Sequence, residues 1–399
     1  QMKKLLLLFI VAFLVTIFFA RTSFAQITDA ADRRRPNILV DDDKVQCPTA
    51  AYTSIQAAVN AANPGDYIRV CPGTYPEQVT ISKSLLIRAD NGVTVIPSSV
   101  VSNATGPSGD AVAAIFVVEN SDDVQLAGFI VDGSANGLSQ CSPRLVGILY
   151  ENASGAILHN AVRNTQLASS LNGCQSGNAI EVESASSMQS RVGIAENSID
   201  SYQKNGITAN EAGSLVLIDG NTVTGIGPTT GAAQNGIQIG FGANGRIINN
   251  VVADNVYSPC VSVSNCPADA AGILIYQSDG VTIDHNTVGA SQIGVLVAAN
   301  SAFVTNNTVF HSALLDGIAL IGNTNSASRN TISNSGEAAV YVQGNNNSIS
   351  ENDITGASVG ILKISGSTGT VRFGNQFFAT GIPVEDPAPP RNFTPVPSH

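Results

Sequence analysis

Two glutamates, Glu181 and Glu183, have the residue type and spacing that acid–base chemistry needs. In an extended strand, residues two positions apart point to the same face, with their Cα atoms roughly 6.5 Å apart. Inverting glycosidases hold two carboxyl groups about 6.5–9.5 Å apart, one as the general acid and the other as the general base. The pair therefore suggests glycoside hydrolysis, with Glu183 as the acid and Glu181 as the base.

Two other interpretations of this pair stay open. Glutamates on the outer face of a strand are often ordinary solvated surface. A group of carboxylate and amide oxygens can instead bind Ca²⁺, at roughly 2.3–2.6 Å from the ion. The choice depends on the elements that carry the two residues and on the groups beside them.

A repeat determines these elements. The pattern Asn-x-Ile/Val recurs at Asn286, Asn307, Asn330 and Asn352, in steps of 21, 23 and 22 residues. A period of this size is typical of a solenoid, in which each repeat needs only its neighbours. Alternating apolar residues precede the asparagine in most copies, and a third short segment of the Gly-Ile type follows. Three short strands per repeat, without a helical segment between them, predict a parallel β-helix.

The repeated asparagine is interpreted as structural. It falls at the tight bend between the first two strands, where left-handed backbone is needed and Asn is tolerated. Stacked about 4.8 Å apart, successive side-chain amides can hydrogen-bond as a ladder. We expect the ladder to contain Asn197, Asn221, Asn250, Asn286, Asn307, Asn330 and Asn352.

The segment YTSIQAAVNAANPGDYIRVCPGTYPEQVTISKSLLIRADNGVTVI (52–96), together with the repeats, resembles the right-handed parallel β-helix proteins of the pectin-lyase-like superfamily. The resemblance covers about residues 37 to 378, and it implies a cap helix followed by the first coils. The apolar spacing of an amphipathic helix is found at Ile55, Ala58, Val59 and Ala62. We expect Thr53 and Gln56 to form its capping box. The predicted fold is all-β: a single-stranded right-handed parallel β-helix of about 10–12 coils with an N-terminal amphipathic cap helix.

Long insertions locate a candidate groove. The turn before the Gly-Ile strand is extended at 132–146, 164–178, 224–235 and 253–271, all at one edge of the same sheet. Loops on a rigid scaffold commonly carry binding residues. The resemblance also implies that substrates lie on this sheet.

Alternation along the Gly-Ile strands predicts two outward columns. The first is Phe116, Leu149, Glu181, Thr208, Gln238, Leu274, Leu296, Ala319 and Tyr341. The second is Val118, Glu151, Glu183, Asn210, Gly240, Tyr276, Ala298, Ile321 and Gln343. Glu151 would then lie about 5 Å from Glu183, and this additional like charge favours Glu183 as the protonated acid. We expect a sugar to be bound by Glu151, Asn210, Gln238 and Tyr276.

Six cysteines in an exported chain indicate disulfides rather than metal ligands. About 15 pairings are formally available. Spacing favours Cys47 with Cys71, Cys141 with Cys174, and Cys260 with Cys266. The four histidines are scattered, so we expect no metal site from them. The run Asp41-Asp42-Asp43 is interpreted as a solvated turn, with calcium binding as the alternative.

Residues 1–25 have the features of a secretory signal peptide, because Lys3 and Lys4 precede an apolar run and Ser23-Phe24-Ala25 resembles a cleavage site. We therefore expect a secreted protein, extracellular or periplasmic. Losing Lys3, Lys4 and Arg21 takes the formal net charge from −11 to −14. An acidic surface repels phosphate backbones and anionic lipid, so we expect no nucleic acid and, after removal of the signal peptide, no membrane as partner. We also expect a monomer.

The chain is divided into residues 1–25 (signal peptide), 26–65 (N-terminal segment and cap helix), 66–382 (β-helix) and 383–399 (Pro-rich tail). Three functions stay open: a secreted protein that binds a carbohydrate polymer, a polysaccharide-degrading glycoside hydrolase using Glu181 and Glu183, and a purely structural surface solenoid. A polyuronate lyase is disfavoured, because such an enzyme needs a base and several cations and only Arg144 and Lys204 stand near this acidic groove. Whether the protein is an enzyme stays undecided.

Overall fold

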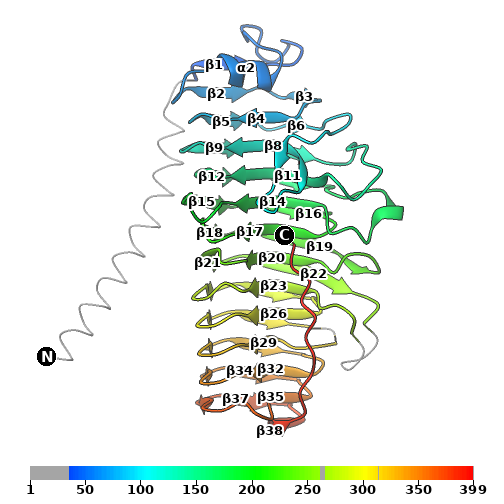
Figure 1. The fold of residues 1–399 in the computed structure, drawn as a ribbon, viewed down its shortest axis with the longest axis vertical. Helices are drawn as coiled ribbons and strands as arrows, with labels where there is room; N and C mark the ends of the chain where they lie inside the picture. Colours follow the sequence, from blue (N-terminus) through cyan, green and yellow to red (C-terminus); the bar gives the residue numbers. More distant parts are fainter. Residues whose placement is uncertain (1–35, 261–265, 313, 399) are drawn as a thin grey trace, which may run out of the picture.

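The computed structural model describes residues 36–260, 266–312 and 314–398 (Figure 1). The expected signal peptide, residues 1–25, lies outside the described residues. None of the helices within the described part of the chain is long and apolar enough to cross a membrane.

The strands stack into three long parallel sheets, here called A, B and C, to which successive coils contribute in turn (Figure 1). Sheet A contains β1 (Ile38–Val40), β2 (Tyr67–Val70), β5 (Leu86–Ala89), β9 (Val124–Ala127), β12 (Gly155–Leu158), β15 (Ser190–Ala195), β18 (Ser214–Asp219), β21 (Asn244–Ile248), β24 (Thr282–Asp284), β27 (Phe303–Thr305), β30 (Ser326–Ser328), β33 (Ser348–Ser350) and β36 (Val371–Phe373). Sheet B contains β3 (Gly73–Tyr75), β6 (Val93–Val95), β10 (Ile130–Asp132), β13 (Ala161–Arg163), β16 (Ser198–Asp200), β19 (Thr222–Thr229), β22 (Val251–Tyr257), β25 (Thr287–Gly289), β28 (Thr308–Phe310), β31 (Thr331–Ser333), β34 (Asp353–Thr355) and β37 (Gln376–Phe378).

Sheet C is the sheet of the Gly-Ile strands. It contains β4 (Val79–Ile81), β8 (Ala111–Glu119), β11 (Arg144–Glu151), β14 (Asn178–Glu183), β17 (Asn205–Asn210), β20 (Asn235–Gly240), β23 (Ala271–Tyr276), β26 (Ile293–Ala298), β29 (Ile318–Ile321), β32 (Ala338–Gln343), β35 (Val359–Ile364) and β38 (Ile382–Ala388), with β7 (Ala104–Thr105) antiparallel to β8. The other elements are α2 (Ile55–Ala61) and the 3₁₀ turn η1 (Ser169–Leu171). The predicted right-handed parallel β-helix is confirmed, and β38 extends sheet C beyond residue 382.

Aliphatic side chains fill the inside of the coils. Ile207, Ile237, Ile273, Val295 and Ile318 are consecutive members of one inward column of sheet C and are fully buried. Each side chain packs on its equivalent one coil on, so a single core runs the length of the molecule.

The asparagine ladder is confirmed. Asn197 Nδ2 donates to Asn221 Oδ1 at 2.9 Å, and the same contact continues from coil to coil as far as Asn352. Asn160 and Asn375 extend it at its two ends. The predicted backbone was wrong by one position: the left-handed residue is the one before the asparagine, as at His285 with φ 56°.

The cap helix is confirmed, but its predicted capping box is wrong. Ser54 is the N-cap, and its Oγ accepts from Ala57 N at 3.2 Å. The Glu77 carboxylate accepts from the backbone N–H groups of Ile55 and Gln56. The Gln56 side chain instead donates to the carbonyl oxygen of Thr80. Glu77, which is distant in sequence, therefore takes over the capping role.

Three disulfides have the predicted partners: Cys47–Cys71, Cys141–Cys174 and Cys260–Cys266. The second joins the insertion before β11 to the insertion before β14, which braces the edge of sheet C. Three disulfides fit an oxidising compartment.

Candidate functional site

Both predicted columns lie on the outer face of sheet C from β11 onwards. Glu151 is paired with Glu183, and Glu183 with Asn210. Glu181 is paired with Thr208, and Thr208 with Gln238. At β8 the prediction was wrong by one residue, because Phe116 and Val118 point into the core. The continuous apolar run of β8 contains no alternation from which its register could be inferred.

Arg144 lies between the two candidate glutamates. Its Nη1 contacts both carboxylate oxygens of Glu181 at 2.7 Å, and its Nη2 lies 3.3 Å from Glu183 Oε1. Its Nε donates to Asp110 Oδ2 at 2.6 Å. Glu181 and Glu183 have no exposed surface, so this is a buried ionic cluster.

The two glutamates have opposite pKa shifts. Burial opposes ionisation of Glu181, but the charge of Arg144 and the hydrogen bonds from Glu183, Asn178 and Arg144 outweigh it and lower its pKa. Burial, followed by the adjacent charge of Glu181, raises the pKa of Glu183 well above its usual value. The opposite shifts favour a proton on Glu183 and a charge on Glu181.

Glu151 lies at the edge of this cluster. It is half-buried, and burial together with the charges of Glu119 and Asp110 raises its pKa. Its partners in register are Glu119 and Glu183. Glu119, Glu151 and Glu183 therefore occupy successive positions of one column, and Glu151 and Glu183 are neighbours as the sequence predicted.

The C-terminal segment, defined as residues 389–398, covers the outer face of sheet C. Figure 1 shows it in red, running from β38 back across the coils towards β17. Asn210 Nδ2 and Gln238 Nε2 donate to the Ser398 carbonyl oxygen at 2.8 and 2.7 Å. Ser398 N donates to Gln238 Oε1 at 2.9 Å, and Asn178 Nδ2 donates to Ser398 Oγ at 3.0 Å.

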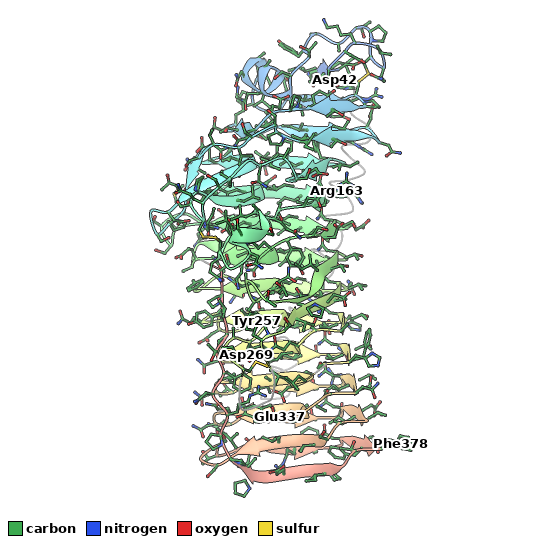
Figure 2. All side chains as sticks on the ribbon, turned by 90° about the vertical axis from the view of Figure 1, so that its right-hand side faces the viewer. Asp42, Arg163, Tyr257, Asp269, Glu337 and Phe378 are labelled. Carbon is green, nitrogen blue, oxygen red and sulfur yellow. A yellow bond between two sulfur atoms is a disulfide. The ribbon has the colours of Figure 1, made fainter. Side chains whose placement is uncertain are left out.

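Further contacts fix this segment along its length. Arg391 forms ion pairs with Asp316, at 2.8 Å, and with Glu337. The Phe393 ring packs against Tyr341 with the ring centroids 4.8 Å apart. Thr394 N donates to Asp269 Oδ2 at 2.5 Å. Figure 2 labels Asp269 and Glu337 on the side of the coils along which the segment runs.

Sequence reasoning missed that the candidate residues are covered. Asn210 and Gln238 have no exposed surface, because Ser398 lies on them. Tyr276 remains partly exposed and packs edge-on against Phe241 at 5.4 Å. One signal was available: the outward column becomes apolar at Leu274 and Leu296, and such a row on a sheet surface indicates that something covers it.

The two acidic groups considered for calcium differ in their surroundings. The guanidinium of Arg144 already contacts the carboxylates of Glu181 and Glu183, so a cation there would meet a positive charge. One oxygen from each of Asp41, Asp42 and Asp43 lies within 4.8 Å of the others. Backbone N–H groups, including those of Cys47 and Thr74, already donate to these carboxylates. Within the described part of the chain, the closeness of these three carboxylates is the sole observation in favour of a metal, and by itself it assigns none.

Lys204 contacts the C-terminal segment, and its burial should make the stability of the protein depend on pH. Its Nζ is fully buried and donates to the carbonyl oxygens of Ala233 and Val396, at 2.6 and 2.5 Å. Burial lowers the pKa of Lys204 to about 7. An unfolded lysine titrates near pH 10.4, so between these values the folded state binds fewer protons and stability rises with pH.

We therefore expect the free energy of unfolding of the parent, relative to that of Lys204→Met, to rise by about 2–3 kcal/mol between pH 7 and pH 9. Urea unfolding of both proteins at several pH values measures this difference. A difference that stays constant over this range would mean that the two carbonyl contacts keep the ammonium charged.

Comparisons with known proteins agree with the fold. The search of curated protein sequences finds no match to this chain. Residues 261–388, less than half of the chain, match the family described as periplasmic copper-binding protein (NosD).

Solved structures match over most of the chain. XylC in complex with xylose is 10% identical, with a TM-score of 0.58 over 90% of this chain and 86% of that chain. The GH136 lacto-N-biosidase from Eubacterium ramulus is 9% identical, with a TM-score of 0.57 over 87% and 68%. The exopolygalacturonase from Thermotoga maritima is 12% identical, with a TM-score of 0.52 over 78% and 84%. These likenesses show the fold of the chain, a right-handed parallel β-helix.

Proposed function

We propose that the protein is an exported carbohydrate-binding β-helix whose ligand binds sheet C on the residues that the C-terminal segment covers. The observation that carries the proposal is the set of contacts to Ser398. Asn178, Asn210 and Gln238 together bind one hydroxyl, one carbonyl and one N–H group. Sugars carry hydroxyl groups, and acetylated amino sugars also carry the amide. The segment would thus stand in for a ligand.

The similar structures support the sugar class. The names of the enzymes from Thermotoga maritima and Eubacterium ramulus refer to sugar polymers or oligosaccharides, and XylC was solved with xylose. Copper binding, which the name of the NosD family suggests, finds little support. The matched residues contain two histidines, His285 and His311, and no methionine, and Cys266 is in a disulfide.

Glycoside hydrolysis is the second candidate function, favoured by the raised pKa of Glu183 beside the lowered pKa of Glu181. Glu183 would protonate the leaving oxygen and Glu181 would activate water. The present arrangement favours binding instead. Both carboxyls contact the guanidinium of Arg144 and have no exposed surface, so neither is free to protonate a leaving oxygen or to activate water in this arrangement.

Loosening the C-terminal segment should therefore increase glycan binding. Phe393→Ala removes the contact with Tyr341 and raises the fraction of molecules with an uncovered face, so we expect apparent affinity to improve by about tenfold. Binding to a panel of polysaccharides measures this change, and release of reducing ends measures hydrolysis. Adding Gln238→Ala to Phe393→Ala should abolish the gain.

Phe303→Ala is the matched control, because Phe303 is an exposed phenylalanine on sheet A. It should leave glycan binding unchanged. If Phe393→Ala loosens the segment and no polymer in the panel binds, the segment only stabilises the coils and the protein is a structural solenoid. Turnover that requires both Glu181 and Glu183 would instead establish the hydrolase.

A further inference from the structure

A second groove crosses the outer face of sheet A, on a different sheet from the site proposed above. Its volume is about 1020 Å³, and β9, β12, β15, β18, β21 and β24 line it in succession. With strands about 4.8 Å apart, these six strands give the groove a length of roughly 24 Å. This strand spacing is close to the length of one pyranose unit in an extended chain. Figure 1 shows five of these strands, β9, β12, β15, β18 and β21, along one side of the coils.

Small residues form the floor of this groove, with larger ones beyond them. One outward column runs Gln125, Ala156, Gly193, Leu217, Arg246. The groove is deepest at Ala156 and Gly193, because the other residues of this column have longer side chains. Leu215, 39% exposed, adds an apolar contact surface.

Two unpaired arginines lie along the groove. Arg191 is exposed and Arg246 is half-exposed. Among the described residues, neither guanidinium makes a hydrogen bond or an ion pair, whereas Arg144 and Arg391 are both paired with acidic side chains. In a chain of formal net charge −11, two unpaired cations in one groove indicate an anionic ligand.

The positions of these arginines suit a polymer. Arg191 lies on β15 and Arg246 on β21, so they are two coils apart, about 10 Å along the axis. If a polysaccharide advances by one sugar unit per coil, this distance places the two arginines opposite alternate sugar units. Exposed amides from Gln189 and Asn244 stand in the same lining and can bind hydroxyl groups. Asp122 and Asp123 lie at the β9 end, so an anionic polymer would be held at the Arg191–Arg246 end.

We propose that this groove binds an extended acidic polysaccharide lying across the coils, with carboxylates of alternate sugar units on Arg191 and Arg246. Carboxylates accept charge-assisted hydrogen bonds from guanidinium groups. The aliphatic surface of Leu215 contacts the C–H face of a sugar ring. A single-stranded nucleic acid fits less well, because the groove has no aromatic residue on which bases could stack and the protein is acidic.

The test uses the full chain and an oligogalacturonate of eight units, with its fully methyl-esterified form as the uncharged probe. We expect the acidic oligomer to bind and the esterified one to bind at least about tenfold more weakly. Arg191→Gln and Arg246→Gln should each reduce affinity on the order of tenfold, and the two losses should add in the double variant. Calorimetry at two salt concentrations measures both affinity and its salt dependence.

Arg329→Gln is the matched control, since Arg329 is an exposed arginine near Glu351 at a bend outside this groove. It should bind like the parent. Equal binding by the parent and the double variant, equal affinity for the esterified oligomer, or tighter binding of an oligothymidylate would each overturn the proposal. Because Phe393→Ala acts on sheet C and these variants on sheet A, either proposed site can fail without the other.

Discussion

Replacing Arg144 by methionine should destabilise the protein by about 3–5 kcal/mol, because it leaves the carboxylate of Glu181 buried without a compensating charge. Arg144 is 7% exposed and both glutamates are fully buried, so water cannot replace the guanidinium. Chemical unfolding in urea measures the loss. Adding Glu181→Gln and Glu183→Gln to Arg144→Met should recover much of it, since the variant then has no buried charge at this pair.

The effect of Arg144→Met should also depend on pH. The folded-state pKa of Glu181 is lowered, so its ionisation contributes stability above the unfolded pKa of about 4.3, and that contribution is lost as pH falls. Parent and Arg144→Met should therefore approach each other in stability below about pH 4. Arg163→Met is the control, because Arg163 pairs with Asp132 while 44% exposed and should cost about 1 kcal/mol or less. Comparable losses for both arginines would contradict the burial argument.

Ile318→Asp should destabilise by about 4 kcal/mol or more, because the side chain points into the core with neither water nor a partner nearby. Alternation along β29 alone suggests that Ala319→Asp, one residue on, would be mild. The structure corrects this expectation. Ala319 points outward but is fully buried, in an apolar cluster that contains Tyr341 and contacts Phe393. We expect Ala319→Asp to cost about 2–4 kcal/mol.

The two aspartate variants can be separated through the C-terminal segment. In the Phe393→Ala background the cost of Ala319→Asp should decrease, because the covering segment is already loosened. The cost of Ile318→Asp should not change, since Val295 and Val340 on the neighbouring coils surround it in either case. Urea melts of the parent, the three single variants and the two double variants measure this coupling. Identical coupling for both positions would mean that the segment does not cover Ala319.

The local sequence contains most of the information that specifies this fold. The coils from Asn286 to Asn352 are only 21–23 residues long and pack on their neighbours, so periodic residues such as Asn286 and Ile318 identify their partners by position alone. Patterns within one coil or between neighbouring coils also predict the cap helix, the register of sheet C from β11 onwards and the disulfide pairs. Prediction of the register was wrong at β8, where an unbroken apolar run gives no alternation.

Whether Glu181, Asn210 and Gln238 lie open to solvent depends on contacts between residues far apart in the chain. Ser398 contacts Asn178 across a separation of 220 residues, and no periodic pattern predicts such a contact. Arg144 compensates the charge of Glu181 from the preceding coil of sheet C, and Glu77 caps α2 in place of the nearby Gln56. The sequence thus determined which residues share the outer face of sheet C, because strand alternation is local. Only the tertiary structure decided that this face is buried, because burial depends on where the C-terminal segment docks.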